Sequence, residues 1–248
     1  MKKKNIILTG SEGLIGTSFR LYAEKKGHRV FCIDKIKKKR NDYFKCDILN
    51  ELKVKELIKK IFHKNEINLL INNASFNPAV EKKLKKFKFS EYSLNVWKKN
   101  LEVDIFGTFI ITKHVSKYFE KKGIGNILNI SSIYGLVGPD QSIYETQESF
   151  KGFKPLEYSV AKAGMIGFTK ALAAFYAKSK IKVNCLILGG VKNKQKKSFI
   201  NKYNNKTILK RMAEVDEYNP YIDFFGVETN DYMTGSCIVV DGGATSIL

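Results

Sequence analysis

The sequence places a tyrosine and a lysine four residues apart, at Tyr158 and Lys162. The surrounding pattern predicts a helix, on which positions i and i+4 share a face, so both side chains would point into the same space. A phenol normally ionises near about pH 10, and a neighbouring cation lowers that value. The pair could therefore transfer a proton, although a Tyr and a Lys at this spacing are more often an ordinary solvated helix face.

A strand, a glycine turn and a helix are predicted at the N-terminus. Residues 4–8 are expected to form a short buried strand, and the turn Thr9–Gly16 has the spacing T-G-x-x-G-x-x-G. In such a turn Gly10 allows the tight bend, Gly13 lets the backbone approach a pyrophosphate, and Gly16 lets the helix pack on the strand. The free N–H groups of the helix start attract the phosphates. Three further residues of the turn are expected at the cofactor: Glu12, Leu14 and Ile15.

The second predicted strand, residues 29–33, ends in Asp34. A carboxylate there suits a ribose 2′-hydroxyl and repels a 2′-phosphate, so Asp34 favours NAD over NADP. Two alternatives stay open. A strand-end acid can simply cap the next turn, and the following lysines, Lys35 and Lys37–Lys39, could hold a phosphate after all.

Length and composition predict one domain over residues 1–248. The chain can bury a sizeable core, and none of its apolar runs approaches the roughly 18 residues of a membrane span. The lysines at the N-terminus precede only a short apolar stretch, which predicts no export. Four scattered cysteines without C-x-x-C spacing predict buried thiols in a reducing cytoplasm and no metal site. They are Cys32, Cys46, Cys185 and Cys237.

The net charge is strongly positive, with 44 Lys and Arg against 24 Asp and Glu, formally +20. Such a charge would suit nucleic acid or another polyanion. The lysines, however, are spread along the whole chain without an arginine-rich arm or a helix-turn-helix pattern, which argues against nucleic acid. A phosphorylated or nucleotide-linked substrate, or an acidic carrier protein, would use the same field.

Strands and helices alternate along the chain without a linker or a repeat. This alternation predicts an α/β fold, a single Rossmann-type doubly wound parallel sheet with helices on both faces, in which ligands bind at the carboxyl ends of the strands. The further strands are predicted over residues 41–47, 67–71, 126–130, 182–187 and 237–240, and the further helices over residues 51–64, 94–121 and 156–178.

Five motifs follow one another in the order found in short-chain dehydrogenases/reductases, a family that the chain resembles over essentially its full length. They are Thr9–Gly16, Asn72-Asn73-Ala74, Asn129–Ser132, Tyr158-x-x-x-Lys162 and Gly235–Gly243. The resemblance implies that a serine orients the substrate oxygen, a tyrosine exchanges its proton, and a lysine assists the tyrosine and holds the nicotinamide ribose. By position these roles fall to Ser132, Tyr158 and Lys162, with Ser131 as an alternative hydroxyl.

The resemblance also implies further cofactor contacts, from Asp47, Ile48, Asn73, Ala74, Gly189 and Val191. The turn 188–191 lacks the proline that is common before its glycine. It is equally consistent with an ordinary loop after a strand.

An inserted segment, about 134–155, separates Ser132 from Tyr158 by 26 residues, where the family usually has about a dozen. Tyr144 lies at the usual distance, but its i+4 partner is Glu148, which disfavours a phenolate. The segment is rich in hydrogen-bonding groups, which favours a hydroxyl-rich substrate over a sterol or an acyl chain. These groups are Tyr134, Asp140, Gln141, Tyr144, Glu145 and Gln147. The segment resembles the branch of the family found with flagellin modification and surface-glycan biosynthesis.

Asp104 stands where many members of the family have an asparagine that steadies a water relay behind the lysine. An ionised Asp accepts hydrogen bonds but donates none, so a rearranged relay is expected. A carboxylate near Lys162 could still keep that lysine charged. Asp104 therefore joins the catalytic candidates.

The sequence thus predicts an NAD(P)-dependent oxidoreductase that interconverts a secondary alcohol and a ketone on a sugar or a sugar-derived acid. One alternative is a 3-oxoacyl carrier-protein reductase, whose basic surface would dock the acidic carrier. Another is a non-catalytic dinucleotide-binding protein, against which the intact Ser132, Tyr158 and Lys162 argue. A homotetramer or homodimer is expected from the resemblance and from the apolar excess of the helices predicted over 94–121 and 156–178.

Overall fold

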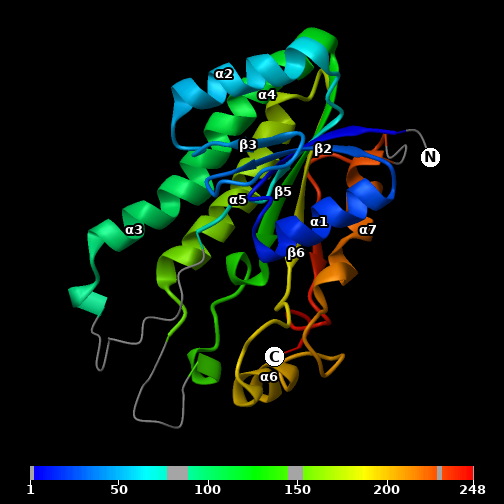
Figure 1. The fold of residues 1–248 in the computed structure, drawn as a ribbon. Coiled ribbons are helices and arrows are strands. Elements are labelled where there is room, and N and C mark those ends of the chain that lie inside the picture. Colours follow the sequence, from blue (N-terminus) through cyan, green and yellow to red (C-terminus); the bar gives the residue numbers. More distant parts are fainter. Residues whose placement is uncertain (1–2, 77–88, 145–152, 228–230, 248) are drawn as a thin grey trace.

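Seven parallel strands form one sheet in the order β3-β2-β1-β4-β5-β6-β7 (Figure 1). The structure is a computed structural model that describes residues 3–76, 89–144, 153–227 and 231–247. The strands are β1 (Asn5–Thr9), β2 (Arg29–Asp34), β3 (Tyr43–Lys45), β4 (Leu69–Asn72), β5 (Ile124–Ser132), β6 (Lys180–Leu188) and β7 (Cys237–Val240). The strand predicted over residues 41–47 is therefore shorter than expected. The strand order reverses between β1 and β4, which is where such sheets bind ligands.

Helices cover both faces of the sheet (Figure 1). On one face pack α2 (Glu51–Lys64), α4 (Thr108–Lys122) and α5 (Leu156–Phe175). On the other pack α1 (Leu14–Lys25) and the segments η5 (Val215–Tyr218), α7 (Pro220–Ile222) and η6 (Asp223–Val227). The remaining helical segments are η1 (Phe89–Glu91), α3 (Leu94–Leu101), η2 (Glu102–Gly107), η3 (Ile133–Gly135), η4 (Gln141–Tyr144) and α6 (Lys197–Asn204). The predicted doubly wound fold is confirmed.

Strand β1 shows why its sequence is continuously apolar. Ile7 packs in the cluster under α2 and α4, whereas Ile6 and Leu8 pack in the cluster under α1. Successive side chains of a strand point to opposite faces, and both faces of this central strand are covered. The strand therefore carries the glycine turn at its end on a support that is buried from both sides.

The helix predicted over residues 94–121 is present as three contiguous helical segments, α3, η2 and α4, but it is not uniformly α-helical. Between α3 and α4 lies η2, a π-helical segment of six residues. A π-turn inserts a residue into the helical repeat, which a periodicity of 3.6 residues cannot reveal, and such turns are frequent at functional sites. Within η2, Asp104 is only 1% exposed. Gly107 lies so close to Ile48 that an added Cβ would be 2.5 Å from its Cδ1 atom.

The four cysteines are free thiols, three of them buried and Cys237 partly exposed. Among the residues that the structure describes, no helix combines the length and the apolar composition needed to cross a membrane.

Candidate active site

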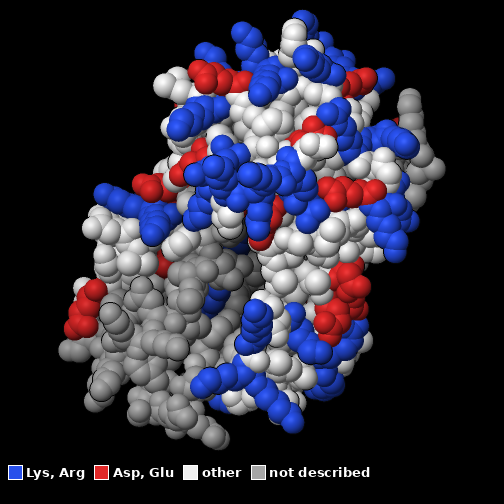
Figure 2. Space-filling view, in the orientation of Figure 1, with Lys and Arg blue, Asp and Glu red and all other residues white. Residues whose placement is uncertain are grey.

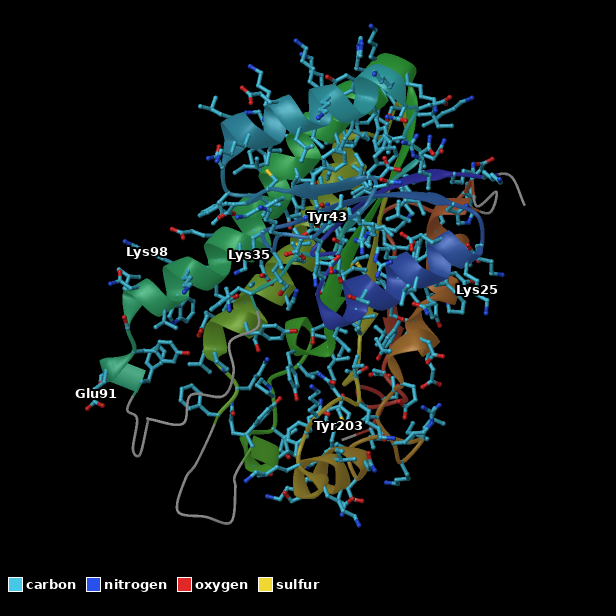
Figure 3. The ribbon with its side chains drawn as sticks, viewed as in Figure 1. Lys25, Lys35, Tyr43, Glu91, Lys98 and Tyr203 are labelled. Carbon is cyan, nitrogen blue, oxygen red and sulfur yellow. The ribbon has the colours of Figure 1, made fainter. Side chains whose placement is uncertain are left out.

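A cavity of about 1340 Å³ opens at the carboxyl ends of the strands. Lys98 of α3 and Tyr203 of α6 both line it, from elements far apart in the sequence (Figure 3). Figure 2 shows a hollow in this face, with Lys and Arg side chains gathered along its edge. The cavity wall includes every residue predicted to contact the cofactor: Gly10, Glu12, Gly13, Leu14, Ile15, Asp34, Asp47, Ile48, Asn73, Ala74, Tyr158, Lys162, Gly189 and Val191.

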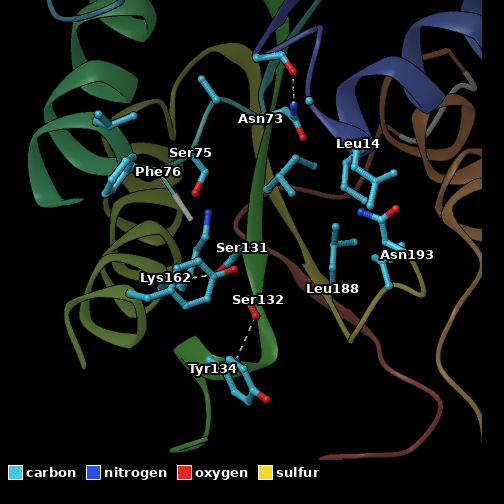
Figure 4. A pocket seen from close by; sticks show the side chains of 18 of the residues that line it. Leu14, Asn73, Ser75, Phe76, Ser131, Ser132, Tyr134, Lys162, Leu188 and Asn193 are labelled. Carbon is cyan, nitrogen blue, oxygen red and sulfur yellow. Dashed lines mark hydrogen bonds between the residues drawn. The ribbon is translucent and has the colours of Figure 1, made fainter. Parts of the chain in front are cut away.

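The glycine turn is held in a conformation that side chains would disrupt. Gly10 has φ +64°, and a Cβ there would lie 2.7 Å from the Cα of Ala74. A Cβ at Gly16 would lie 2.1 Å from the carbonyl oxygen of Gly10. The amide of Asn73 donates to that same oxygen at 3.0 Å (Figure 4). The start of α1, with Gly13 as its N-cap, is thereby fixed at the cavity wall.

Asp34 serves two purposes at the end of β2. One carboxylate oxygen accepts a hydrogen bond from the N–H of Ile36 at 3.1 Å, so Asp34 does cap the next turn. The other accepts from the N–H of Glu12 at 2.9 Å. Arg40 donates to the Glu12 carboxylate at 2.8 Å. The cavity end nearest β2 therefore carries two carboxylates, one of them compensated by Arg40.

Tyr158 and Lys162 share the cavity-facing side of α5, as their spacing predicts. The ammonium of Lys162 lies 5.5 Å from the ring centroid of Tyr158. Ser131 is 2% exposed, and its hydroxyl donates to the carbonyl of Lys162 at 2.8 Å. Ser132 is half-buried at the cavity wall, and its hydroxyl oxygen accepts a hydrogen bond from the N–H of Tyr134 at 3.3 Å (Figure 4). Ser132 thus keeps its proton for another partner, whereas Ser131 fixes α5 to β5.

Asp104 binds Lys162 directly. Its carboxylate lies 3.0 Å from the Lys162 ammonium and accepts from the Ser75 hydroxyl at 2.7 Å and the Phe76 N–H at 2.8 Å. All three partners are donors, which suits a group that only accepts. Burial alone would lower the pKa of Lys162, but Asp104 and Tyr158 outweigh burial and raise it. Lys162 is therefore held as a cation at the cavity wall.

The surroundings of Tyr144 disfavour a role in proton transfer, although it lines the cavity. Its hydroxyl donates to that of Tyr134 at 2.8 Å, and its ring lies 5.3 Å from that of Phe199. Burial, followed by the neighbouring Tyr134, raises the pKa of Tyr144. Part of the inserted segment, with Glu145, Gln147 and Glu148, lies outside the described residues.

Sequence reasoning missed Lys154. It is 8% exposed, lines the cavity and places its ammonium 3.7 Å from the ring centroid of Tyr158. Lys154 precedes α5, so helical spacing from Tyr158 gave no signal. The Pro155 after it marks a helix start, and a lysine just before such a start was the only hint. Among the described residues, no three His, Cys, Asp or Glu side chains are placed to share a metal ion.

Comparisons with known proteins agree with this architecture. A family model described as enoyl-(acyl carrier protein) reductase matches residues 22–245. The chain is 28% identical to post-translational flagellin modification protein A of Campylobacter coli and 27% identical to a 3-oxoacyl-acyl-carrier-protein reductase of Buchnera aphidicola, each over 98% of both chains. A crystal structure of a short chain dehydrogenase from Leptospira borgpetersenii with bound NAD+ superposes with a TM-score of 0.86 and 29% identity, over 99% of this chain and 94% of that one.

The fold, the cavity and these matches together define the class of protein. The chain belongs to the short-chain dehydrogenase/reductase family and is an oxidoreductase.

Proposed function

We propose that the protein uses NAD(H) to interconvert a secondary alcohol and a ketone on a sugar or sugar-derived acid, in surface-glycan biosynthesis in the cytoplasm. The observation that carries the proposal is the convergence of Ser132, Tyr158 and Lys162 with the glycine turn on one cavity. The flagellin modification protein, similar over nearly the whole of both chains, supports the substrate class. The Leptospira dehydrogenase with bound NAD+ supports the cofactor.

The residues present fit a dinucleotide. The start of α1 lies at the cavity wall, after a glycine turn in which a Cβ at Gly10 or Gly16 would clash with neighbouring backbone atoms. Asp34 offers a carboxylate at the end of β2. When bound, the nicotinamide supplies hydride transfer. Gly10, Gly13 and Asn73 would border the pyrophosphate side, and Lys162 would hold the nicotinamide ribose.

The chain's own part in the reaction is to move one proton. In the reducing direction the Tyr158 hydroxyl gives its proton to the substrate oxygen while Ser132 donates a hydrogen bond to the same atom. The Lys162 cation stabilises the negative charge that develops on the phenol oxygen. Asp104 keeps Lys162 charged and in place. In the oxidising direction the proton returns to Tyr158.

A panel assay tests the proposal. Sugar nucleotides, sugar acids and polyols are offered with NAD+ or NADH, and absorbance in the nicotinamide band is followed. Turnover on one hydroxylated class, lost in Tyr158→Phe, is the expected result. Turnover confined to 3-oxoacyl thioesters would instead support a carrier-protein reductase. This is the second candidate because of the Buchnera relative and of three exposed lysines at the cavity mouth, Lys98, Lys99 and Lys196. No turnover on any compound would support the non-catalytic alternative.

We expect NAD(H) to bind more tightly than NADP(H), because the carboxylate of Asp34 would face the 2′-phosphate. Asp34→Ala should narrow the difference between the two cofactors. Fluorescence titration of both with wild type and variant measures it. Equal or reversed affinities in the wild type would mean that Arg40 and the lysines after Asp34 dominate.

We expect a homotetramer or homodimer. Large apolar side chains stay exposed on the helices of one sheet face: Phe106 is 57%, Phe109 50% and Phe175 77% exposed. Burying such a face between copies would remove that apolar area from water. Light scattering at micromolar concentration should give a multiple of 28.3 kDa, and a value near 28.3 kDa itself would contradict the expectation.

A further inference from the structure

Arg40 lies beside two carboxylates, on the segment that joins β2 to β3. Its guanidinium donates to the Glu12 carboxylate at 2.8 Å and lies 5.2 Å from the ring centroid of Tyr43. The backbone N–H of Glu12 in turn donates to the Asp34 carboxylate at 2.9 Å. The glycine turn, the end of β2 and the start of β3 therefore bring two acids, one arginine and one aromatic ring together.

The ion pair between Glu12 and Arg40 is partly shielded from water. The Glu12 side chain is 11% and the Arg40 side chain 27% exposed. Such a pair attracts more strongly than one in open solvent, because less water screens the two charges. Of the two residues, Glu12 lines the cavity and Arg40 does not. The carboxylate therefore separates the arginine from any ligand in the cavity.

The surroundings of Tyr43 show how close these charges are. Burial, followed by the charges of Asp34 and Glu12, raises the pKa of Tyr43 to about 12, whereas Arg40 acts in the opposite direction. The phenol is thus neutral at physiological pH, and its ring is a platform for the Arg40 cation. The contact with this ring does not depend on Glu12, so Arg40 should stay at the same place when Glu12 is replaced.

A 2′-phosphate at the end of β2 would meet the carboxylate of Asp34 and, beside it, that of Glu12. The guanidinium of an arginine is well suited to a phosphate, because its planar fork can bind two oxygens at once. Here Glu12 holds that guanidinium and compensates its charge. The protein thus contains a phosphate-binding side chain at this position and keeps it occupied.

We infer that Glu12 enforces the preference for NAD(H) by withholding Arg40 from a 2′-phosphate, in addition to the repulsion that Asp34 exerts. The inference rests on the proposed function for the place of the adenosine ribose at the end of β2. Glu12 is thereby a specificity-determining residue, and its effect depends on the presence of Arg40.

Calorimetry with adenosine 2′,5′-bisphosphate and 5′-AMP tests the inference without turnover. The two probes differ only in the 2′-phosphate, so the ratio of their affinities reports on that group alone. Glu12→Ala should shift the ratio toward the bisphosphate by about 10- to 100-fold, as expected for one arginine–phosphate contact. Glu12→Gln keeps the side-chain length and an oxygen that can accept from Arg40, so its shift should be smaller and in the same direction.

A double-mutant cycle with Arg40→Met separates the release of the arginine from the loss of a repulsive charge. In the Arg40→Met background, Glu12→Ala should shift the ratio by less than about fivefold, the size of the repulsion between two nearby charges in water. Glu102→Ala is the matched control, because it removes an exposed carboxylate from another part of the cavity wall. It should change the ratio by less than about threefold.

Fluorescence titration of NADH and NADPH gives a second readout, in which Glu12→Ala should shift the preference toward NADPH by a similar factor. Three results would overturn the inference: no gain in bisphosphate binding by Glu12→Ala, an equal gain with and without Arg40, or an equal gain in Glu102→Ala. A gain independent of Arg40 would assign the phosphate to the exposed lysines Lys35 and Lys37–Lys39. Failure of the proposed function looks different, since it appears as absent NADH binding or absent turnover in the wild type.

Discussion

Replacing Tyr158 by phenylalanine should lower kcat by about 100- to 10,000-fold while NADH binds with close to wild-type affinity. The ring still packs beneath Lys154 and beside Lys162, so the cavity keeps its shape. What is lost is the proton that the hydroxyl exchanges with the substrate oxygen. Steady-state kinetics on the best substrate of the panel, with fluorescence titration of NADH, measures both quantities.

Tyr144→Phe is the matched control, because it removes a hydroxyl from the same cavity. That hydroxyl makes a hydrogen bond to Tyr134, worth about 1 kcal/mol, so kcat should fall by no more than about fivefold. If Tyr144→Phe abolished turnover while Tyr158→Phe left it near normal, the inserted segment would have to carry the catalytic tyrosine.

Asp104→Asn should be strongly destabilising and should also reduce turnover. An asparagine leaves the Lys162 ammonium buried without its anionic partner, and breaking such a pair costs about 3–5 kcal/mol. Its amide group would also face one of the three donors that now bind the carboxylate. The melting temperature should fall by on the order of 10 °C, measured by calorimetry with and without NADH.

A double-mutant cycle with Lys162→Met separates the pair from the site. The double variant should lose less stability than the two single variants added together, because it leaves no buried charge without its partner. An Asp104→Asn enzyme with undiminished melting temperature and turnover would contradict the prediction. It would show that this cavity accepts the asparagine arrangement common in the family.

Local sequence was sufficient wherever the relevant geometry spans a few residues. The glycine turn is fixed by three glycines within seven positions, and Tyr158 and Lys162 share a face because a helix repeats every 3.6 residues. The alternation of strands and helices predicted the doubly wound sheet for the same reason, since each element can be recognised from its own local hydrophobic pattern. The residues predicted to contact the cofactor line one cavity, because parallel strands end at one edge of the sheet.

Only the tertiary structure decided which distant groups meet at that edge. The π-turn of η2 places Asp104 against Lys162, which lies 58 positions later in the chain, and the hydrophobic periodicity of the sequence does not predict such a turn. Two hydrogen bonds join Gln141 to Lys154, and the Lys154 ammonium reaches the ring of Tyr158. Ser131 and Ser132 are distinguished only by what surrounds them, since one hydroxyl meets α5 and the other meets the cavity. The sequence thus determined which reactive side chains this protein has. Long-range packing decided which charged groups surround them, because contacts between separate elements depend on how those elements dock and not on their spacing in the chain.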